Sequence, residues 1–163
     1  MPEGPKRLDD VNAWFRARGA LPPRAFADGG DCVEATLQGH DALMCRGVPD
    51  SLPTGESVYP MSIFYVHDKK TELALVTPIA AGPLDREIVL GEPAPDDMYV
   101  ELEATLDAAG TTLTIAEKPG KTCNQILAQY TSAESSGHRR VVQKACAARG
   151  KYVLQNGKLV RTP

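Results

Sequence analysis

The chain has 163 residues, of which 42% are hydrophobic and 24% are charged, a composition typical of an ordinary globular domain that can bury a sizeable core. No apolar run approaches the about 18–20 residues that are needed to cross a membrane. The first ten residues, MPEGPKRLDD, lack the apolar core of a secretory signal. We therefore expect either a cytosolic protein or a mature chain from which a signal has been removed.

The net charge of −3 conceals an uneven distribution of charge along the chain. Residues 118–163 contain nine lysines and arginines and one acid, a net charge of +8, whereas residues 1–117 contain nine basic and twenty acidic residues, a net charge of −11. This asymmetry has two interpretations. The two parts of one domain attract each other, or the C-terminal region presents a basic face to an anionic partner.

Residues 8–18 are predicted to form an N-terminal helix. Asp9 or Asp10 can cap its start, and Gly19 stands where a helix commonly ends. Leu8, Val11, Trp14 and Phe15 share its apolar face, to which Arg18 can also belong. We expect Trp14, the single tryptophan of the chain, to anchor this helix on a sheet rather than to form a ligand platform.

The first predicted β-hairpin joins residues 32–37 to residues 42–46. If Gln38-Gly39 is a two-residue turn, Cys32 falls opposite Cys45 at a non-hydrogen-bonded position. Cα atoms are about 4.5 Å apart at such a position, a separation that a disulfide can span. Because Gln-Gly lacks the strong turn preference of Asn-Gly, a four-residue loop is an alternative.

The next predicted hairpin pairs residues 58–66 with residues 71–77. The charged run at 67–70 forms its turn, and Pro60 suits an edge or the beginning of a strand. A breaker run at 78–84 is expected to end the second strand. A short strand is then predicted at 86–90.

The clearest strand pattern lies in residues 98–106. Val100, Leu102, Ala104 and Leu106 alternate with polar residues, which predicts one buried and one solvated face. The chain returns through a four-residue turn into a strand at 111–116. In simple register Ala104 lies opposite Leu113, so the apolar faces of the two strands agree.

Residues 121–149 are predicted to form two short antiparallel helices joined by a polar run. The apolar stripes are Cys123, Ile126, Leu127 and Tyr130 in the first helix and Val142, Ala145, Cys146 and Arg149 in the second. Because Cys123 begins the first helix and Cys146 ends the second, a short connection brings the two thiols level. A disulfide can then close the open end of the helical hairpin.

The last predicted element is a β-hairpin at 151–161, where Asn156-Gly157 is a strong signal for a type I′ turn. The elements together predict a single α+β domain: an antiparallel sheet of about five to eight strands, with an N-terminal helix and a disulfide-closed helical hairpin packed on one face. Its divisions are the helix at 8–18, the β-hairpins at 32–116, the helical hairpin at 121–149 and the terminal β-hairpin at 151–161.

The four cysteines determine the expected compartment. There is no C-x-x-C motif and no histidine at zinc-finger spacing, so we expect neither a metal site nor another cofactor. The pairs Cys32–Cys45 and Cys123–Cys146 each close one predicted hairpin. Disulfides favour an extracytoplasmic location, periplasmic or secreted, whereas four free thiols would favour the cytoplasm.

Few residues form a pattern with catalytic meaning. The sequence contains no nucleophile elbow, phosphate-binding loop, dinucleotide fingerprint or calcium loop. Glu101 and Glu103 share one face of a predicted strand, about 7 Å apart by strand rise, which resembles the spacing of glycosidase carboxylates. His67 precedes Asp68 and could recruit it as an orienting group. These two pairs leave a small hydrolase as an alternative function.

The favoured function is a non-catalytic exported module that binds a protein partner, such as an inhibitor or a subunit of an envelope or secreted complex. A second alternative is binding of an anionic ligand, a nucleic acid or an acidic glycan by the basic C-terminal region. The residues that would contact it are Arg139, Arg140, Lys144, Arg149, Lys151, Lys158 and Arg161. Such binding should weaken steeply with salt.

Overall fold

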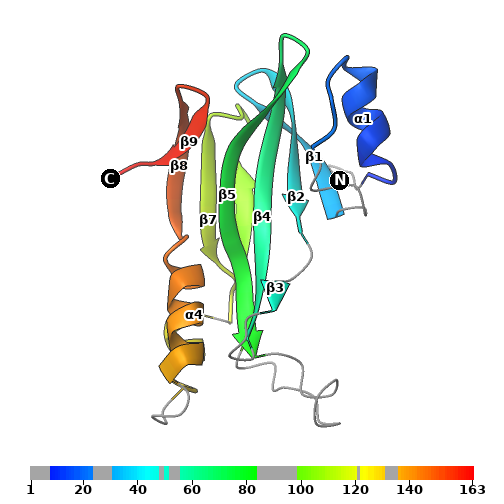
Figure 1. The fold of residues 1–163 in the computed structure, drawn as a ribbon. Coiled ribbons are helices and arrows are strands. Elements are labelled where there is room, and N and C mark those ends of the chain that lie inside the picture. The colour runs from blue at the N-terminus through cyan, green and yellow to red at the C-terminus, as the bar shows by residue number, and fades with distance from the viewer. Residues whose placement is uncertain are drawn as a thin grey trace.

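A computed structural model describes residues 8–23, 31–47, 50–51, 56–83, 99–120, 122–130 and 136–163 (Figure 1). Its helices are α1 (Val11–Ala17), α3 (Cys123–Leu127) and α4 (Ser136–Cys146). Its strands are β1 (Asp31–Leu37), β2 (His40–Arg46), β3 (Asp50–Ser51), β4 (Glu56–His67), β5 (Lys70–Pro83), β6 (Val100–Leu106), β7 (Thr112–Glu117), β8 (Gly150–Gln155) and β9 (Lys158–Arg161). The strand predicted at 86–90 lies outside the described residues.

The described strands form one antiparallel sheet, as predicted. Eight of them follow one another in the order β1-β2-β4-β5-β6-β7-β8-β9, and the two-residue β3 pairs with β4 as a ninth. β5 pairs with β6 only at Ala80 and Ala81. The sheet curls so that two turns distant in this order meet: the backbone N–H of Gln38, in the β1–β2 turn, donates a hydrogen bond of 2.9 Å to the carbonyl of Gly110, in the β6–β7 turn.

The β4–β5 hairpin is longer than the sequence predicted, because β5 continues to Pro83. The prediction that a breaker run ends the strand at residue 78 is therefore wrong, because β5 extends from Lys70 to Pro83. Pro78 lies opposite Pro60 of β4, and the ladder has an irregularity at Pro60. A proline cannot donate a hydrogen bond to the ladder. Because the two prolines face each other, the missing donors fall at one position of the hairpin instead of two.

Three hairpins close with two-residue turns. The angle φ is 46° and 81° at Gln38 and Gly39, 49° and 60° at Asp68 and Lys69, and 50° and 80° at Asn156 and Gly157. Positive φ at both central residues is what a type I′ turn requires. The two-residue turn at Gln38-Gly39 and the turn at Asn156-Gly157 are confirmed. The middle turn is tighter than the predicted run at 67–70, because His67 pairs with Lys70.

The register of β6 and β7 differs by two residues from the predicted one. Leu106, rather than Ala104, lies opposite Leu113. The wider turn depends on Asp107, whose carboxylate accepts hydrogen bonds from the backbone N–H of Thr111 (2.7 Å) and from its hydroxyl (2.8 Å). Because a shift of two residues preserves the alternation of side chains, the predicted apolar faces still meet.

Apolar side chains are buried on both faces of the sheet. The main core includes Ile63, Tyr65, Leu113, Ile115, Val142 and Tyr152, and joins the sheet to α3 and α4. The smaller α1 core contains Val11, Trp14, Phe15, Ala20, Cys32, Leu43, Cys45 and Phe64. Neighbouring residues of β2 divide between them, with Ala42 in the main core and Leu43 in the α1 core. Since successive residues of a strand point to opposite faces, the prediction that all helices pack on one face is wrong.

The helices near the C-terminus cover the main core. α3 is only five residues long, and its start is stabilised by a capping box in which Thr122 and Gln125 each bond to the backbone of the other. α4 packs on β5 and also contacts β4 and β6. In Figure 1, α4 and α1 lie on opposite sides of the sheet.

The contact between the β1–β2 and β6–β7 turns gives a testable prediction. Gly110 has φ 66°, and a Cβ there would lie 2.3 Å from the carbonyl oxygen of Thr36. Gly110→Ala should lower the free energy of unfolding by about 2–4 kcal/mol, because strain in the left-handed region adds to a backbone clash. Urea denaturation of the disulfide-bonded protein measures this change.

Gly39→Ala is the matched control. Gly39 also has positive φ, 81°, but a Cβ there would meet nothing within 4 Å. Its substitution should cost only about 1 kcal/mol. Equal losses of stability in the two variants would show that the contact between the turns does not hold the sheet in its curled form.

Candidate functional site

Two disulfides join the cysteines in the pairs that the hairpins predict. Cys32 lies opposite Cys45 in the β1–β2 register with Cα atoms 4.1 Å apart, and the Cα atoms of Cys123 and Cys146 are 6.1 Å apart. All four side chains are buried, the first pair in the α1 core and the second in the main core. Disulfides persist in oxidising compartments, so these bonds indicate an extracytoplasmic environment.

The seven basic residues expected to contact an anionic partner do not form one free surface. Nζ of Lys158 donates a hydrogen bond of 2.7 Å to the carbonyl of Leu73 in β5. The guanidinium of Arg139 donates to the carbonyl of Leu127, the last residue of α3. Both side chains therefore connect elements of the fold.

Two further arginines bind backbone carbonyls at the end of α4. Arg149 donates to the carbonyl of Cys146 (2.8 Å) and forms an ion pair with Glu117 of β7. Arg161 donates to the carbonyls of Ala147 and Arg149. The last carbonyls of a helix have no partner within the helix, so these guanidinium groups stabilise that end.

Three of the seven basic side chains are left for a partner. Arg140 and Lys144 lie four residues apart on α4, and Lys151 lies on β8. All three are exposed, and within the described part of the chain none of them forms an ion pair or a side-chain hydrogen bond. The candidate anionic contact is therefore smaller than the sequence predicted.

The glutamates considered for hydrolysis have different surroundings. Oε1 of Glu101 accepts a hydrogen bond of 2.7 Å from Arg46, and Oε2 lies 3.1 Å from Nζ of Lys118. The hydrogen bond from Arg46, assisted by Lys118, outweighs partial burial and lowers the pKa of Glu101. A general acid needs the opposite shift. Glu103 is exposed and has no ion pair with any described residue.

The second pair considered for hydrolysis lies at the end of the β4–β5 hairpin. Nε2 of His67 is 3.3 Å from Oδ2 of Asp68, and the two side chains are 55% and 84% exposed. The ring of His67 also meets that of His40 edge to face, with centroids 4.8 Å apart. Across the described ranges, no group of three or more His, Cys, Asp or Glu side chains could hold a metal ion.

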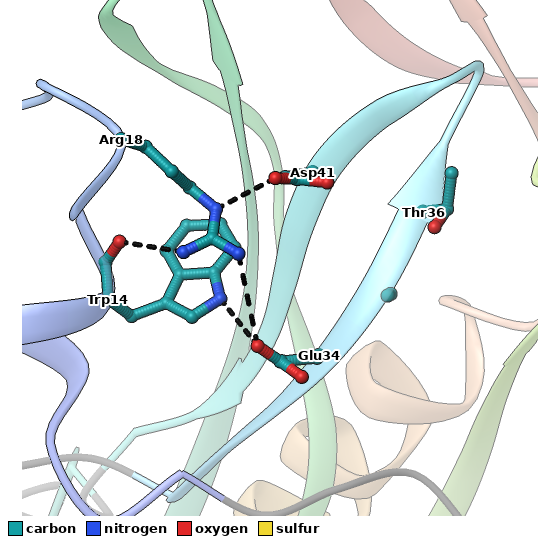
Figure 2. A pocket seen from close by; sticks show the side chains of 6 residues that line it. Trp14, Arg18, Glu34, Thr36 and Asp41 are labelled. Carbon is teal, nitrogen blue, oxygen red and sulfur yellow. Dashed lines mark hydrogen bonds and ion pairs between the residues drawn. The ribbon is translucent and has the colours of Figure 1, made fainter.

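A pocket that the sequence did not predict lies where α1 meets β1 and β2 (Figure 2). Its volume is about 220 Å³, and it is lined by Trp14, Arg18, Glu34, Ala35, Thr36 and Asp41. The guanidinium carbon of Arg18 lies 3.9 Å from the centroid of the Trp14 ring, the arrangement of a cation–π contact. We call this feature the Trp14 pocket.

Hydrogen bonds fix the side chains of the Trp14 pocket. Arg18 donates from Nε to Asp41 (2.8 Å) and from a terminal nitrogen to the carbonyl of Trp14 (2.9 Å). The indole N–H of Trp14 donates to Oε1 of Glu34 (2.8 Å), and the other terminal nitrogen of Arg18 lies 4.0 Å from the same oxygen. The aromatic ring and the two carboxylates together hold the cation of Arg18.

The α1 segment contributes one half of this pocket, and the β1–β2 hairpin contributes the other half. Trp14 and Arg18 are four residues apart in the predicted helix, and the predicted hairpin register places Glu34 and Asp41 on one face of β1 and β2. What the sequence does not contain is a local signal that the helix covers this face. The surface over Leu43 and Cys45 was the available clue, since both are apolar and share the face of Glu34.

Comparison with known proteins found no match. No family model matches the chain, and no curated protein or solved structure shows significant similarity to it. In the described part of the chain, no helix has the length and apolar character needed to cross a lipid bilayer. The structure thus defines a mostly antiparallel β protein with two disulfides and a pocket beneath its first helix.

The ion pairs of Glu101 predict how stability depends on pH. Because the folded pKa of this carboxyl is lowered from its ordinary value of 4.5, its stabilising effect is complete above that value and is lost as pH falls through the lower folded pKa. The stability difference between wild type and Glu101→Gln should therefore be constant near neutral pH and shrink below about pH 4.5. Urea denaturation across pH measures it.

Glu103→Gln serves as the control on the same strand. Glu103 has no ion pair with a described residue, so its substitution should change stability by less than about 0.5 kcal/mol. A wild-type advantage over Glu101→Gln that persists unchanged in acid would contradict the assignment of the low pKa to Glu101.

Proposed function

We propose that the protein is a non-catalytic binding or accessory module that acts outside the cytoplasm, in a periplasmic or secreted setting. Suitable roles are an inhibitor or a subunit of an envelope or secreted complex. The observation that carries the proposal is the pair of disulfides, each buried in a different core. Such bonds stabilise an exported chain where no cytosolic reductant acts on it.

The environment of the candidate catalytic residues favours binding over hydrolysis. Arg46 and Lys118 hold the Glu101 carboxylate in its charged state, whereas acid catalysis near neutral pH requires a carboxyl that keeps its proton. The His67 and Asp68 side chains are largely exposed at a turn, where water competes with their contact. A small hydrolase therefore has less support than a binding module.

The redox state of the cysteines tests the proposed compartment. Protein isolated from its native host should be denatured without reduction, alkylated with iodoacetamide and weighed by mass spectrometry. We expect no alkylated cysteine before reduction and four after it, because both disulfides form in an oxidising compartment. Alkylation of all four cysteines without reduction would exclude export as the basis of the function.

A second function is favoured by Arg140, Lys144 and Lys151. We propose that these exposed cations, which are not engaged by the described part of the fold, bind an anionic partner. Arg140 and Lys144 lie on one side of α4, and Lys151 follows in β8. A cationic contact of this kind releases counterions, so its strength depends on salt.

Heparin provides a probe for this second function. The Arg140→Gln/Lys144→Gln variant should elute from a heparin column at lower salt than the wild type. The slope of log affinity against log salt should fall in magnitude by about two, because two cationic contacts are lost.

The matched control is Arg16→Gln/Lys70→Gln, which removes the same charge from exposed positions of α1 and β5. It should elute like the wild type. Equal shifts for the two variants would show an effect of net charge alone and contradict a site on α4.

A further inference from the structure

The Trp14 pocket carries an unbalanced charge. Two carboxylates, Glu34 and Asp41, face the single guanidinium of Arg18, which leaves the lining with a net charge of −1. Open space of about 220 Å³ adjoins these groups. The pocket therefore has both the room and the charge for one additional small cation.

The second oxygens of the two carboxylates are available to such a cation. Glu34 uses Oε1 toward Trp14 and Arg18, and Asp41 uses Oδ2 toward Arg18. In the part of the chain that the structure describes, Oε2 of Glu34 and Oδ1 of Asp41 accept no side-chain hydrogen bond. Figure 2 shows the free oxygen of Glu34 directed away from Trp14 and Arg18. The side chains of Glu34 and Asp41 are 39% and 61% exposed, so a ligand can reach them.

We propose that the Trp14 pocket binds a guanidinium group, such as that of an arginine side chain, beside Arg18. The incoming group donates hydrogen bonds to the outer oxygens of Glu34 and Asp41 and makes the cluster electrically neutral. The proposal names the chemical group that a binding module of this kind recognises. Only the biological use of the pocket rests on the proposed function.

A guanidinium suits this pocket better than an ammonium does. It is planar, is weakly hydrated and presents donors in a fork that matches carboxylate oxygens. Arg18 already shows the arrangement, since its guanidinium stacks on Trp14 and donates to Asp41 at once. An ammonium is strongly hydrated and binds as a point charge, so it lacks the planar fork that matches carboxylate oxygens.

The charge of the surrounding chain also favours a cation. The chain as a whole has a net charge of −3, the same sign as the pocket lining. A surface of that sign raises the local concentration of cations and speeds their association. The same surface disfavours an anionic ligand at this place.

Intrinsic fluorescence gives a direct test, because Trp14 is the single tryptophan of the chain. The full disulfide-bonded protein is titrated with methylguanidinium at constant ionic strength, and with neutral methylurea in parallel. We expect a saturable change with methylguanidinium at a dissociation constant of about 1–10 mM, as for one exposed ionic contact. Methylurea should give no saturable change. A linear response that is equal for both compounds would overturn the proposal.

Variants separate a binding site from a merely structural cluster. Arg18→Gln should tighten methylguanidinium binding by at least about threefold, because removing the internal cation makes the lining more negative. Glu34→Gln should weaken it by at least about threefold for the opposite reason, whereas Glu103→Gln, at a residue that does not line the pocket, should not alter it. Near-UV circular dichroism checks that each variant is folded. Unchanged affinity in both folded pocket variants would contradict the proposal.

The acetylated, amidated tripeptide Gly-Arg-Gly distinguishes the source of the guanidinium. Tighter binding of this peptide than of methylguanidinium assigns the pocket to an arginine of a protein partner, and equal binding assigns it to a small ligand; both results support the site. This outcome is independent of the alkylation experiment. Free thiols in the host protein would contradict export but not the guanidinium site. Failure of the fluorescence titration would contradict the guanidinium site but not export.

Discussion

Strands β2 and β4 are apolar on both of their faces, and the rest of the structure depends on this constraint. Ala42 and Leu43 of β2 are both fully buried, as is Ile63 of β4, and its neighbour Phe64 is 6% exposed. Because neighbours in a strand point in opposite directions, both faces of the sheet must be covered. Helix α1 covers one face, and the curled second half of the sheet with α3 and α4 covers the other.

This constraint also creates the Trp14 pocket. Burying Trp14 and Phe15 against Leu43 brings α1 close to the β1–β2 hairpin. Arg18, one turn after Trp14, then reaches Asp41 across the edge of the α1 core. The stem of an arginine can lie on apolar surface while its guanidinium stays in water. The polar cluster is thus a consequence of where the apolar face of the helix must lie.

The sequence predicts features whose cause is local. The Asn156-Gly157 turn sets its own hairpin register, and the alternation around Gln38-Gly39 places Cys32 opposite Cys45. The underestimated length of β5, by contrast, has its cause elsewhere in the chain. Pro78 reads as a breaker until Pro60 is seen opposite it.

The site follows the same division between local and tertiary causes. The two halves of the Trp14 pocket can be inferred from α1 and from the β1–β2 hairpin separately. The two halves meet only if α1 packs on the face that carries Glu34 and Asp41. Because β2 is apolar on both faces, its sequence pattern does not determine which face the helix covers. Likewise, the sequence places Arg149 and Arg161 in a basic region, but only the folded chain brings both to the end of α4.

The charge asymmetry of the chain is therefore partly structural. Four of the seven C-terminal cations that were candidates for a partner bind carbonyls within the fold, and Arg149 also pairs with an acid of the N-terminal part, Glu117. What is left is three exposed cations, on α4 and β8, and a net negative pocket beside α1. In Figure 1, α4 and α1 lie on opposite sides of the sheet. Because the two areas lie apart and have opposite signs, a partner that binds one of them leaves the other free for a second contact.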